Sequence, residues 1–275
     1  MKRRAALIAV LALVCGAIAL YVGHRLSPRP AYNEYGQLIF YPGKREVPRP
    51  VITRRTLVAF TFGQSNAANH GSEKFRAVNA NIVNFWNGRY FAAEDPLLGA
   101  TGDGGSVWMR VATKLIAAKA FDSAILLVAG ISAATVQDWS TGGNLNAMLE
   151  QRLVTARDAG LTVTHFLWHQ GEADSAAPDP ASYDAAMQPI IALTRRYFPQ
   201  SKFFVAQATI CGHGAMPNLG LQKAQLGLER LPGVYAGPNT DEIGSAGRYD
   251  GCHMNGSGLD QHAMGWAASI AAHLD

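Results

Sequence analysis

The sequence predicts an α/β fold, a three-layer α/β/α sandwich around a central parallel sheet. From residue 57 onward, short apolar runs alternate with longer helical patterns. Continuous apolar runs are typical of strands buried on both faces, and strands separated by helices pair in parallel through right-handed crossovers. The length of 275 residues is enough for one large domain of this kind with a full core.

The expected elements alternate along the chain. Strands are expected at residues 57–62, 81–86, 123–129, 163–168, 203–209 and 233–235. Helices are expected at residues 107–119, 144–159, 180–197, 219–231 and from just after Gly258 to His273. The carboxyl ends of parallel strands share one edge of the sheet, which is where ligands bind in such folds.

Residues 1–22 are interpreted as a signal peptide or membrane anchor rather than as part of the fold. Lys2-Arg3-Arg4 precedes an apolar run from residue 5 to residue 22, the pattern of a targeting segment. Ala17-Ile18-Ala19 offers a cleavage site, but the apolar run continues beyond it, which favours an uncleaved anchor. Either form predicts an exported domain, periplasmic or extracellular, and a retained segment would anchor it to the inner membrane.

Residues 23–55 are expected to form a basic, proline-rich connector, and residues 56–275 the globular domain. Residues 1–56 hold ten Lys and Arg against two Glu, a net charge of +8, and the rest of the chain holds 14 basic and 18 acidic residues, a net charge of −4. The connector is either a membrane-proximal tether or a plain surface arm. Because the domain itself is mildly acidic, no nucleic-acid partner is expected.

Ser65 is the candidate nucleophile. It lies in Gly63-Gln64-Ser65-Asn66, directly after the first strand of the domain, where Gly63 permits a sharp exit from the strand. A hydroxyl is a weak nucleophile unless a base lies beside it. Taken alone, these residue types more often form a helix cap or a turn.

Three further motifs are expected at the same edge of the sheet. They are Ala129-Gly130-Ile131-Ser132, Trp168-His169-Gln170-Gly171-Glu172-Ala173-Asp174 and Tyr249-Asp250-Gly251-Cys252-His253. Acyl transfer to water needs a nucleophile, a base and hydrogen-bond donors for the oxyanion. His253 is the expected base and Asp250 the carboxylate that orients it. The expected oxyanion donors are the backbone N–H groups of Ser65 and Gly130 and the amide of Gln170, with Gln64, Asn66 and Glu172 in supporting roles.

Some of these residues have other interpretations. Asp-x-x-His before a helix is more often a capped turn, and Gln170 at a strand end is often only a loop residue. His169 is an alternative base, although it points to the face opposite to Gln170. Glu172 and Asp174 are an alternative acid–base pair, but their spacing does not favour carboxylates that face each other across a sugar.

The chain resembles the sialate O-acetylesterase-like carbohydrate esterases of the SGNH-hydrolase superfamily. The resemblance covers roughly residues 57–270 and rests on Gly63-Gln64-Ser65-Asn66, Trp168-x-Gln170-Gly171-Glu172-x-Asp174 and Asp250-x-x-His253. It implies a flavodoxin-like sandwich and hydrolysis of acetyl esters on carbohydrate without a metal or cofactor. It also implies the roles given above for Ser65, Gly130, Gln170, Asp250 and His253. Ala67, where Met is common, is a departure that concerns substrate shape more than chemistry.

Cys211 and Cys252 are the only cysteines outside the leader. An even number in an exported domain permits a disulfide, which would pin the loop that carries His253, and two independent thiols are the alternative. Trp108, Trp139 and Trp168 are expected mainly in the core rather than against a sugar.

Together the motifs predict an exported serine esterase that removes acetyl or other short acyl groups from carbohydrate through a Ser-His-Asp triad. The same residues fit an acyltransferase that passes the acyl group to a sugar hydroxyl. The fold also fits a glycan-binding module without catalysis. The intact set of Ser65, Gly130, Gln170, Asp250 and His253 favours the esterase.

Overall fold

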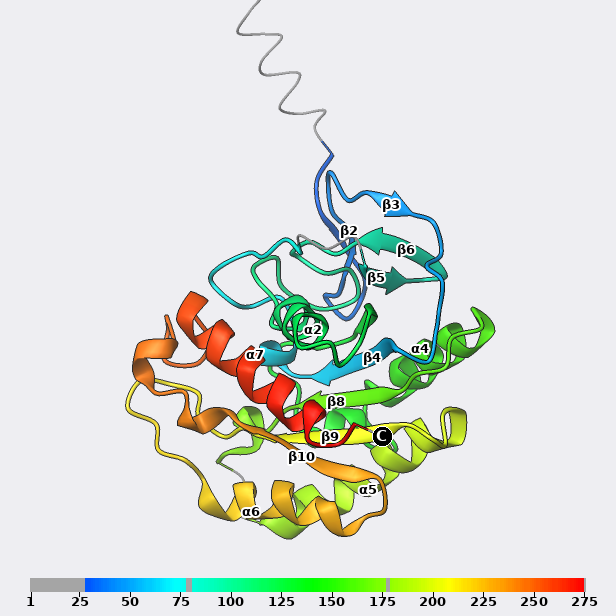
Figure 1. Cartoon of the computed structure of the whole chain (residues 1–275). Coiled ribbons are helices and arrows are strands. Elements are labelled where there is room, and N and C mark those ends of the chain that lie inside the picture. Colours follow the sequence, from blue (N-terminus) through cyan, green and yellow to red (C-terminus); the bar gives the residue numbers. More distant parts are fainter. Residues whose placement is uncertain (1–27, 78–80, 177–178, 275) are drawn as a thin grey trace, which may run out of the picture.

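The centre of the molecule is an eight-stranded sheet with the order β10-β9-β8-β4-β7-β5-β6-β3 (Figure 1). The computed structural model describes residues 28–77, 81–176 and 179–274. Six strands run parallel, and they correspond to the six predicted ones: β4 (Thr56–Gly63), β5 (Ile82–Trp86), β7 (Ser123–Val128), β8 (His165–His169), β9 (Lys202–Gln207) and β10 (Val234–Asn239). The predicted α/β class is therefore confirmed.

The sheet is mixed rather than fully parallel. β6 (Arg89–Ala92) pairs antiparallel with β5, and β3 (Glu46–Val47) pairs antiparallel with β6. Asn87 and Gly88 form the two-residue turn between β5 and β6, with φ of 46° and 78°, and Asn-Gly is a strong hairpin signal because both positions need positive φ. β7 rather than β5 lies beside β4, so the order also differs from the 2-1-3-4-5 order of flavodoxin.

Helices cover both faces of the sheet (Figure 1). On one face lie α2 (Trp108–Ala117) and α7 (Gly256–Ala271), which pack against each other. The other face is covered by α3 (Val136–Trp139), α4 (Asn146–Asp158), α5 (Pro180–Tyr197) and α6 (Leu219–Gly227). The five predicted helices are confirmed, and α3 is an additional short one.

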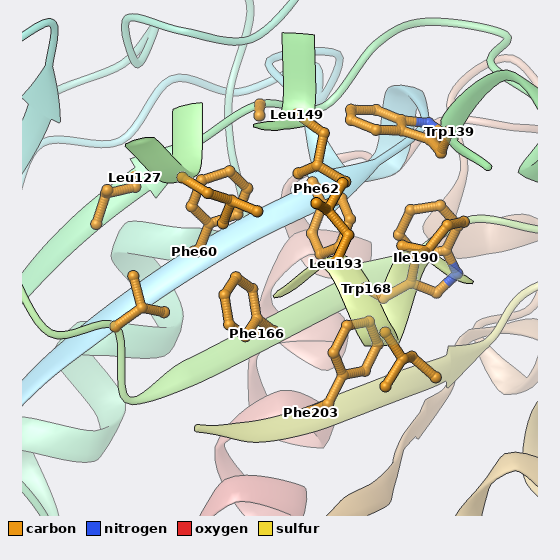
Figure 2. Close-up of a cluster of buried hydrophobic side chains, with 14 of the residues drawn as sticks. Phe60, Phe62, Leu127, Trp139, Leu149, Phe166, Trp168, Ile190, Leu193 and Phe203 are labelled. Carbon is orange, nitrogen blue, oxygen red and sulfur yellow. The ribbon is translucent and has the colours of Figure 1, made fainter. Parts of the chain in front are cut away.

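Aromatic side chains from neighbouring strands build the core under α4 and α5. Phe62 packs edge-on against Trp168, with ring centroids 4.8 Å apart, and against Trp139 at 5.4 Å (Figure 2). On the opposite face, Trp108 packs against Trp266. The expectation that Trp108, Trp139 and Trp168 belong to the core is confirmed, since each is at most 1% exposed.

Part of the predicted connector is built into the domain. β1 (Ala31–Tyr32) and β2 (Leu38–Phe40) pair with each other, and β3 extends the main sheet. Leu38 is fully buried beside Trp86 and Leu98. The expectation of an extended connector over residues 23–55 is therefore wrong for these strands, because their backbone is paired and Leu38 is buried in the core.

The predicted targeting segment, residues 1–22, lies outside the described residues. Within residues 28–77, 81–176 and 179–274, no helix has the length and apolar character needed to cross a membrane.

Replacing Leu38 tests whether β2 belongs to the folded domain. Leu38→Ala should lower the free energy of unfolding by about 2–4 kcal/mol, because it removes buried methyl groups and leaves a cavity. Ile39→Ala is the matched control, since Ile39 is 37% exposed, and it should change stability by less than about 0.5 kcal/mol. Urea unfolding followed by tryptophan fluorescence would measure both. Equal, small effects would contradict the assignment of this segment to the core.

Candidate active site

The candidate site lies at the carboxyl end of β4, where the strand order reverses. From β4 the chain builds β5 and β7 on one side and then β8, β9 and β10 on the other. The register pairs Thr61 with Val128 and Gly63 with His169. The predicted motifs after β4, β7 and β8 therefore reach the same edge, at the position where open α/β sheets bind ligands.

Gly63 allows β4 and β8 to approach closely at this edge. Its φ is +127°, and a Cβ there would lie 2.0 Å from the carbonyl oxygen of His169. The N–H of Gln64 donates to that same oxygen at 2.9 Å. Ser65 follows at once and begins the 3₁₀ turn η1 (Ser65–Ala67). The position of the serine is thus set by the contact between two buried strands rather than by a free loop.

Asp250 and His253 form the predicted pair. The Oδ2 atom of Asp250 lies 2.6 Å from Nδ1 of His253, and its Oδ1 atom accepts the backbone N–H groups of Cys252 and His253 at 2.9 and 2.7 Å. Burial alone would raise the pKa of Asp250, but these hydrogen bonds lower it to about 2. An ionised Asp250 holds the proton on Nδ1 and leaves the Nε2 lone pair of His253 available as a base.

Asn66 connects the serine turn to the histidine loop. Its Nδ2 atom donates to the carbonyl oxygen of Cys252 at 3.3 Å and to Oε1 of Glu172 at 2.8 Å. Cys252 is joined to Cys211 by a disulfide, which ties the histidine loop to the segment that follows β9. Asn66 is the neighbour of Ser65 and Cys252 is the neighbour of His253, so their hydrogen bond joins the two segments next to the predicted catalytic residues. Among the described residues, neither the Ser65 hydroxyl nor Nε2 of His253 makes a hydrogen bond.

Glu172 is a buried brace behind the serine turn. Besides Asn66, its Oε1 atom contacts Nε2 of His169 at 2.8 Å, and Nδ1 of His169 lies 3.0 Å from Nε2 of His262. Burial alone would raise the pKa of Glu172, but the charge and hydrogen bond of His169 lower it overall. His169 is fully buried and engaged at both ring nitrogens, so the geometry does not favour it as the base. Glu172 is likewise buried and bonded to Asn66 and His169, so it is not arranged as the general acid of a glycosidase.

Three backbone N–H groups around the serine turn, those of Ser65, Asn66 and Gly130, have no acceptor among the described residues. The N–H groups of Gln64, Ala129 and Ile131 are all bonded. A Cβ on Gly130 would lie 2.8 Å from the backbone of Ala67, so glycine is needed for this approach to η1. An oxyanion hole requires N–H groups near the serine that make no hydrogen bond within the protein.

Gln170 lies behind the serine rather than facing open space. It is fully buried, and its Nε2 atom donates to Oε1 of Gln64 at 3.2 Å, to the carbonyl oxygen of Ala134 at 3.1 Å and to the carboxylate of Asp174. Its amide hydrogens are therefore already used, which is at odds with the predicted role as an oxyanion donor. Gln64 braces the same loop, because its Oε1 atom also accepts the N–H groups of Gly171 and Ala173.

The structure adds residues that the motifs did not identify. The ring of His70 stacks on His253 with centroids 5.3 Å apart, and Tyr249 lies over His253 at 6.0 Å. Thr101 donates its N–H to the carbonyl oxygen of Gly130 at 3.0 Å. Tyr249 stands in the motif of Asp250 and His253, although no role was predicted for it, whereas no spacing rule links His70 and Thr101 to the site, since they belong to other loops.

A large cavity lies away from this edge. It has a volume of about 730 Å³ and is lined in part by Arg54, Phe121 and His165, at the opposite end of the strands. It is remote from Ser65, because Thr56 and His165, which line it, begin β4 and β8. Within the described ranges, no group of His, Cys, Asp and Glu side chains is arranged to hold a metal ion.

Glu172→Gln should remove the buried carboxylate that accepts hydrogen bonds from His169 and Asn66, and lower the free energy of unfolding at pH 7 by about 3 kcal/mol. The folded pKa of Glu172 lies below its unfolded value, so its contribution is complete above about pH 4 and is lost as the pH falls further. Wild-type stability should therefore fall more steeply in acid than that of the variant. Urea unfolding from pH 3 to pH 7 measures this, with the exposed Glu34→Gln as control. Parallel curves for wild type and Glu172→Gln would contradict it.

Replacing both bonded cysteines by serine should lower the free energy of unfolding by about 4 kcal/mol, because the disulfide closes a long loop in the unfolded chain. The separation of the two cysteines is 41 residues. Ser245→Ala, on the exposed surface, is the control and should change stability by less than about 0.5 kcal/mol. Thermal unfolding with and without reductant would measure the effect, and a reductant-insensitive melting temperature would argue against a stabilising bond.

Comparisons with known proteins identify the family of the chain. A family model described as carbohydrate esterase, sialic acid-specific acetylesterase, matches residues 56–268. A search among curated protein sequences finds no significant match.

Solved structures share the fold at low sequence identity. A protein from Arabidopsis thaliana is 20% identical, covers 80% of this chain and 99% of its own, and has a TM-score of 0.66. A protein from Parabacteroides merdae described as a GDSL-like lipase is 17% identical over 82% of this chain and 100% of its own, with a TM-score of 0.56. A carbohydrate acetylesterase from Xanthomonas citri is 13% identical over 79% of this chain and 56% of its own, with a TM-score of 0.52. With the family model covering most of the chain, the protein belongs to the sialic acid-specific acetylesterase family of carbohydrate esterases.

Proposed function

We propose that this carbohydrate esterase hydrolyses O-acetyl esters through Ser65, His253 and Asp250, with the N–H groups of Ser65 and Gly130 as the oxyanion hole. The observation that carries the proposal is the 2.6 Å contact between Asp250 and His253, on a loop that Asn66 joins to the serine turn. Buried backbone N–H groups are nearly always bonded, and the unbonded N–H groups of Ser65 and Gly130, like that of Asn66, are available to an acceptor on the substrate.

The proposed reaction follows the serine-hydrolase scheme. Ser65 Oγ attacks the acetyl carbonyl carbon while Nε2 of His253 removes its proton, and the ionised Asp250 stabilises the imidazolium. The N–H groups of Ser65 and Gly130 bind the oxygen that becomes negative. His253 then gives its proton to the sugar oxygen, which leaves as a hydroxyl, and Ser65 is acetylated. Water, deprotonated by His253, attacks this ester, and His253 returns the proton to Ser65 Oγ as its bond to the acyl carbon breaks, which releases acetate and restores the enzyme.

We further propose that the domain is exported and that residues 5–22 anchor it when they are retained. The support is the basic and then apolar pattern of the leader. A disulfide is also favoured by an oxidising compartment.

Ser65→Ala should reduce acetate release from acetylated carbohydrate by about 10⁴-fold or more, because the nucleophile and its acyl intermediate are lost. Ser245→Ala, on the exposed surface, is the matched control and should keep wild-type turnover. The measurement is acetate released from a panel of O-acetylated sialic acid, xylan and peptidoglycan. Turnover by Ser65→Ala at the wild-type rate would rule out the triad.

The same assay separates the two alternatives. An acyltransferase would release little acetate until a sugar acceptor is supplied, and would then form an acylated sugar. A glycan-binding module would bind the panel equally well as wild type and as Ser65→Ala, and neither form would show turnover. The unbonded Nε2 of His253 and the hydrogen-bonded Asp250, both among the described residues, favour the esterase over the binding module.

A further inference from the structure

His70 lies between the two parts of the proposed machinery. Its ring stacks on that of His253, with centroids 5.3 Å apart and an interplanar angle of 24°. Its Nε2 atom lies 3.1 Å from the hydroxyl of Thr101. Its carbonyl oxygen accepts the hydroxyl of Tyr249 at 3.1 Å, and the Tyr249 ring also lies over His253. One residue thus contacts the base, the aromatic ring beside the base and the loop that leads to the oxyanion hole.

Thr101 connects His70 to Gly130. Its N–H donates to the carbonyl oxygen of Gly130 at 3.0 Å, and its hydroxyl accepts the N–H of Ser132 at 2.9 Å. The Thr101 hydroxyl that contacts His70 therefore also binds Ser132, and Thr101 holds the chain on both sides of Ile131. Thr101 therefore links His70 to the Gly130–Ile131 peptide, which directly follows the N–H of Gly130.

The surroundings of His70 keep its imidazole neutral. Burial, and then the nearby His253, lower the pKa of His70 to about 4, against a smaller opposite effect of Asp103 and Asp250. The ring also packs against Gly102, where a Cβ would lie 2.9 Å from its Nε2 atom. In the proposed reaction a positive charge develops on His253. A neutral aromatic face beside that ring accommodates the charge, whereas a second cation at this distance would oppose it.

We propose that His70 is a positioning residue: its neutral ring supports the His253 imidazole and couples it, through Thr101, to the loop that carries Gly130. This inference rests on the proposed function, since it takes His253 as the base. It assigns His70 no proton transfer and no contact with the reacting atoms.

Three variants of His70 test the proposal. His70→Ala removes the supporting ring and should lower kcat about tenfold with KM changed less than about twofold, because misplacement of a catalytic group affects the chemical step. His70→Phe keeps a neutral flat ring and should stay within about threefold of wild type. His70→Lys places a cation beside His253 and should lower kcat and move the acid limb of the pH profile of kcat/KM down by about one unit.

A second readout does not depend on turnover. In the Ser65→Ala background, the ring protons of His253 can be titrated by NMR with and without the additional change His70→Lys. The titration midpoint of His253 should fall by about one pH unit in the lysine variant, because the added cation disfavours the imidazolium. Circular dichroism and the melting temperature establish that each variant is folded, and a comparison of His70→Phe with His70→Lys decides the question if His70→Ala does not fold.

Clear outcomes would overturn the proposal. Wild-type kcat in both His70→Ala and His70→Lys would show that the stacked ring does not matter. An increase in KM alone would assign His70 to substrate contact instead. An unchanged His253 titration in the lysine variant would show that the two rings are not coupled. Failure of the proposed function is distinguishable, because it would appear as full turnover in Ser65→Ala while the titration still decides the coupling of His70 to His253.

Discussion

The close contact between the carboxyl ends of β4 and β8 is the constraint on which the rest of the site depends. Gly63 lies against the backbone of His169, where a residue with a Cβ does not fit. Gln64 then binds that backbone through its N–H and the following loop through its side-chain oxygen. The serine turn is therefore held by strands that rest on the apolar core, which is a more rigid support than a surface loop.

Buried polar groups carry this constraint to the histidine loop. The carboxylate of Glu172 is removed from water, yet Asn66 and His169 both bind its Oε1 atom. In a low-dielectric interior such bonds are strong and an unpaired member is costly, so the network is stable only as a whole. Asn66 also reaches Cys252, the neighbour of His253. Because the serine turn binds the histidine loop directly, the position of each segment restricts that of the other.

The amino-terminal segment supports the other side of the same edge. Gln37 donates from its side chain to the carbonyl oxygen of Gly99 at 2.7 Å, and Leu38 donates its N–H to Ala100 at 2.9 Å. The next residue, Thr101, holds Gly130. Residues whose proline and arginine content suggests a simple connector therefore help to position the loop that presents the N–H of Gly130. Composition reports flexibility on average, whereas burial of a few residues decides whether a segment folds.

The sequence by itself determined the α/β class, the six parallel strands and the motifs of the site, because each depends on a local pattern. Asp250 and His253 are three residues apart, so a single turn brings them together. The antiparallel β6 had a local signal in Asn87-Gly88, but β3 had none. Only the tertiary structure decided that the amide of Gln170 is directed at Gln64, 106 residues away in sequence, and that His70 stacks on His253. Such contacts join loops from different strands, and hydrophobic periodicity specifies which face of an element is buried but not which distant side chain will meet it.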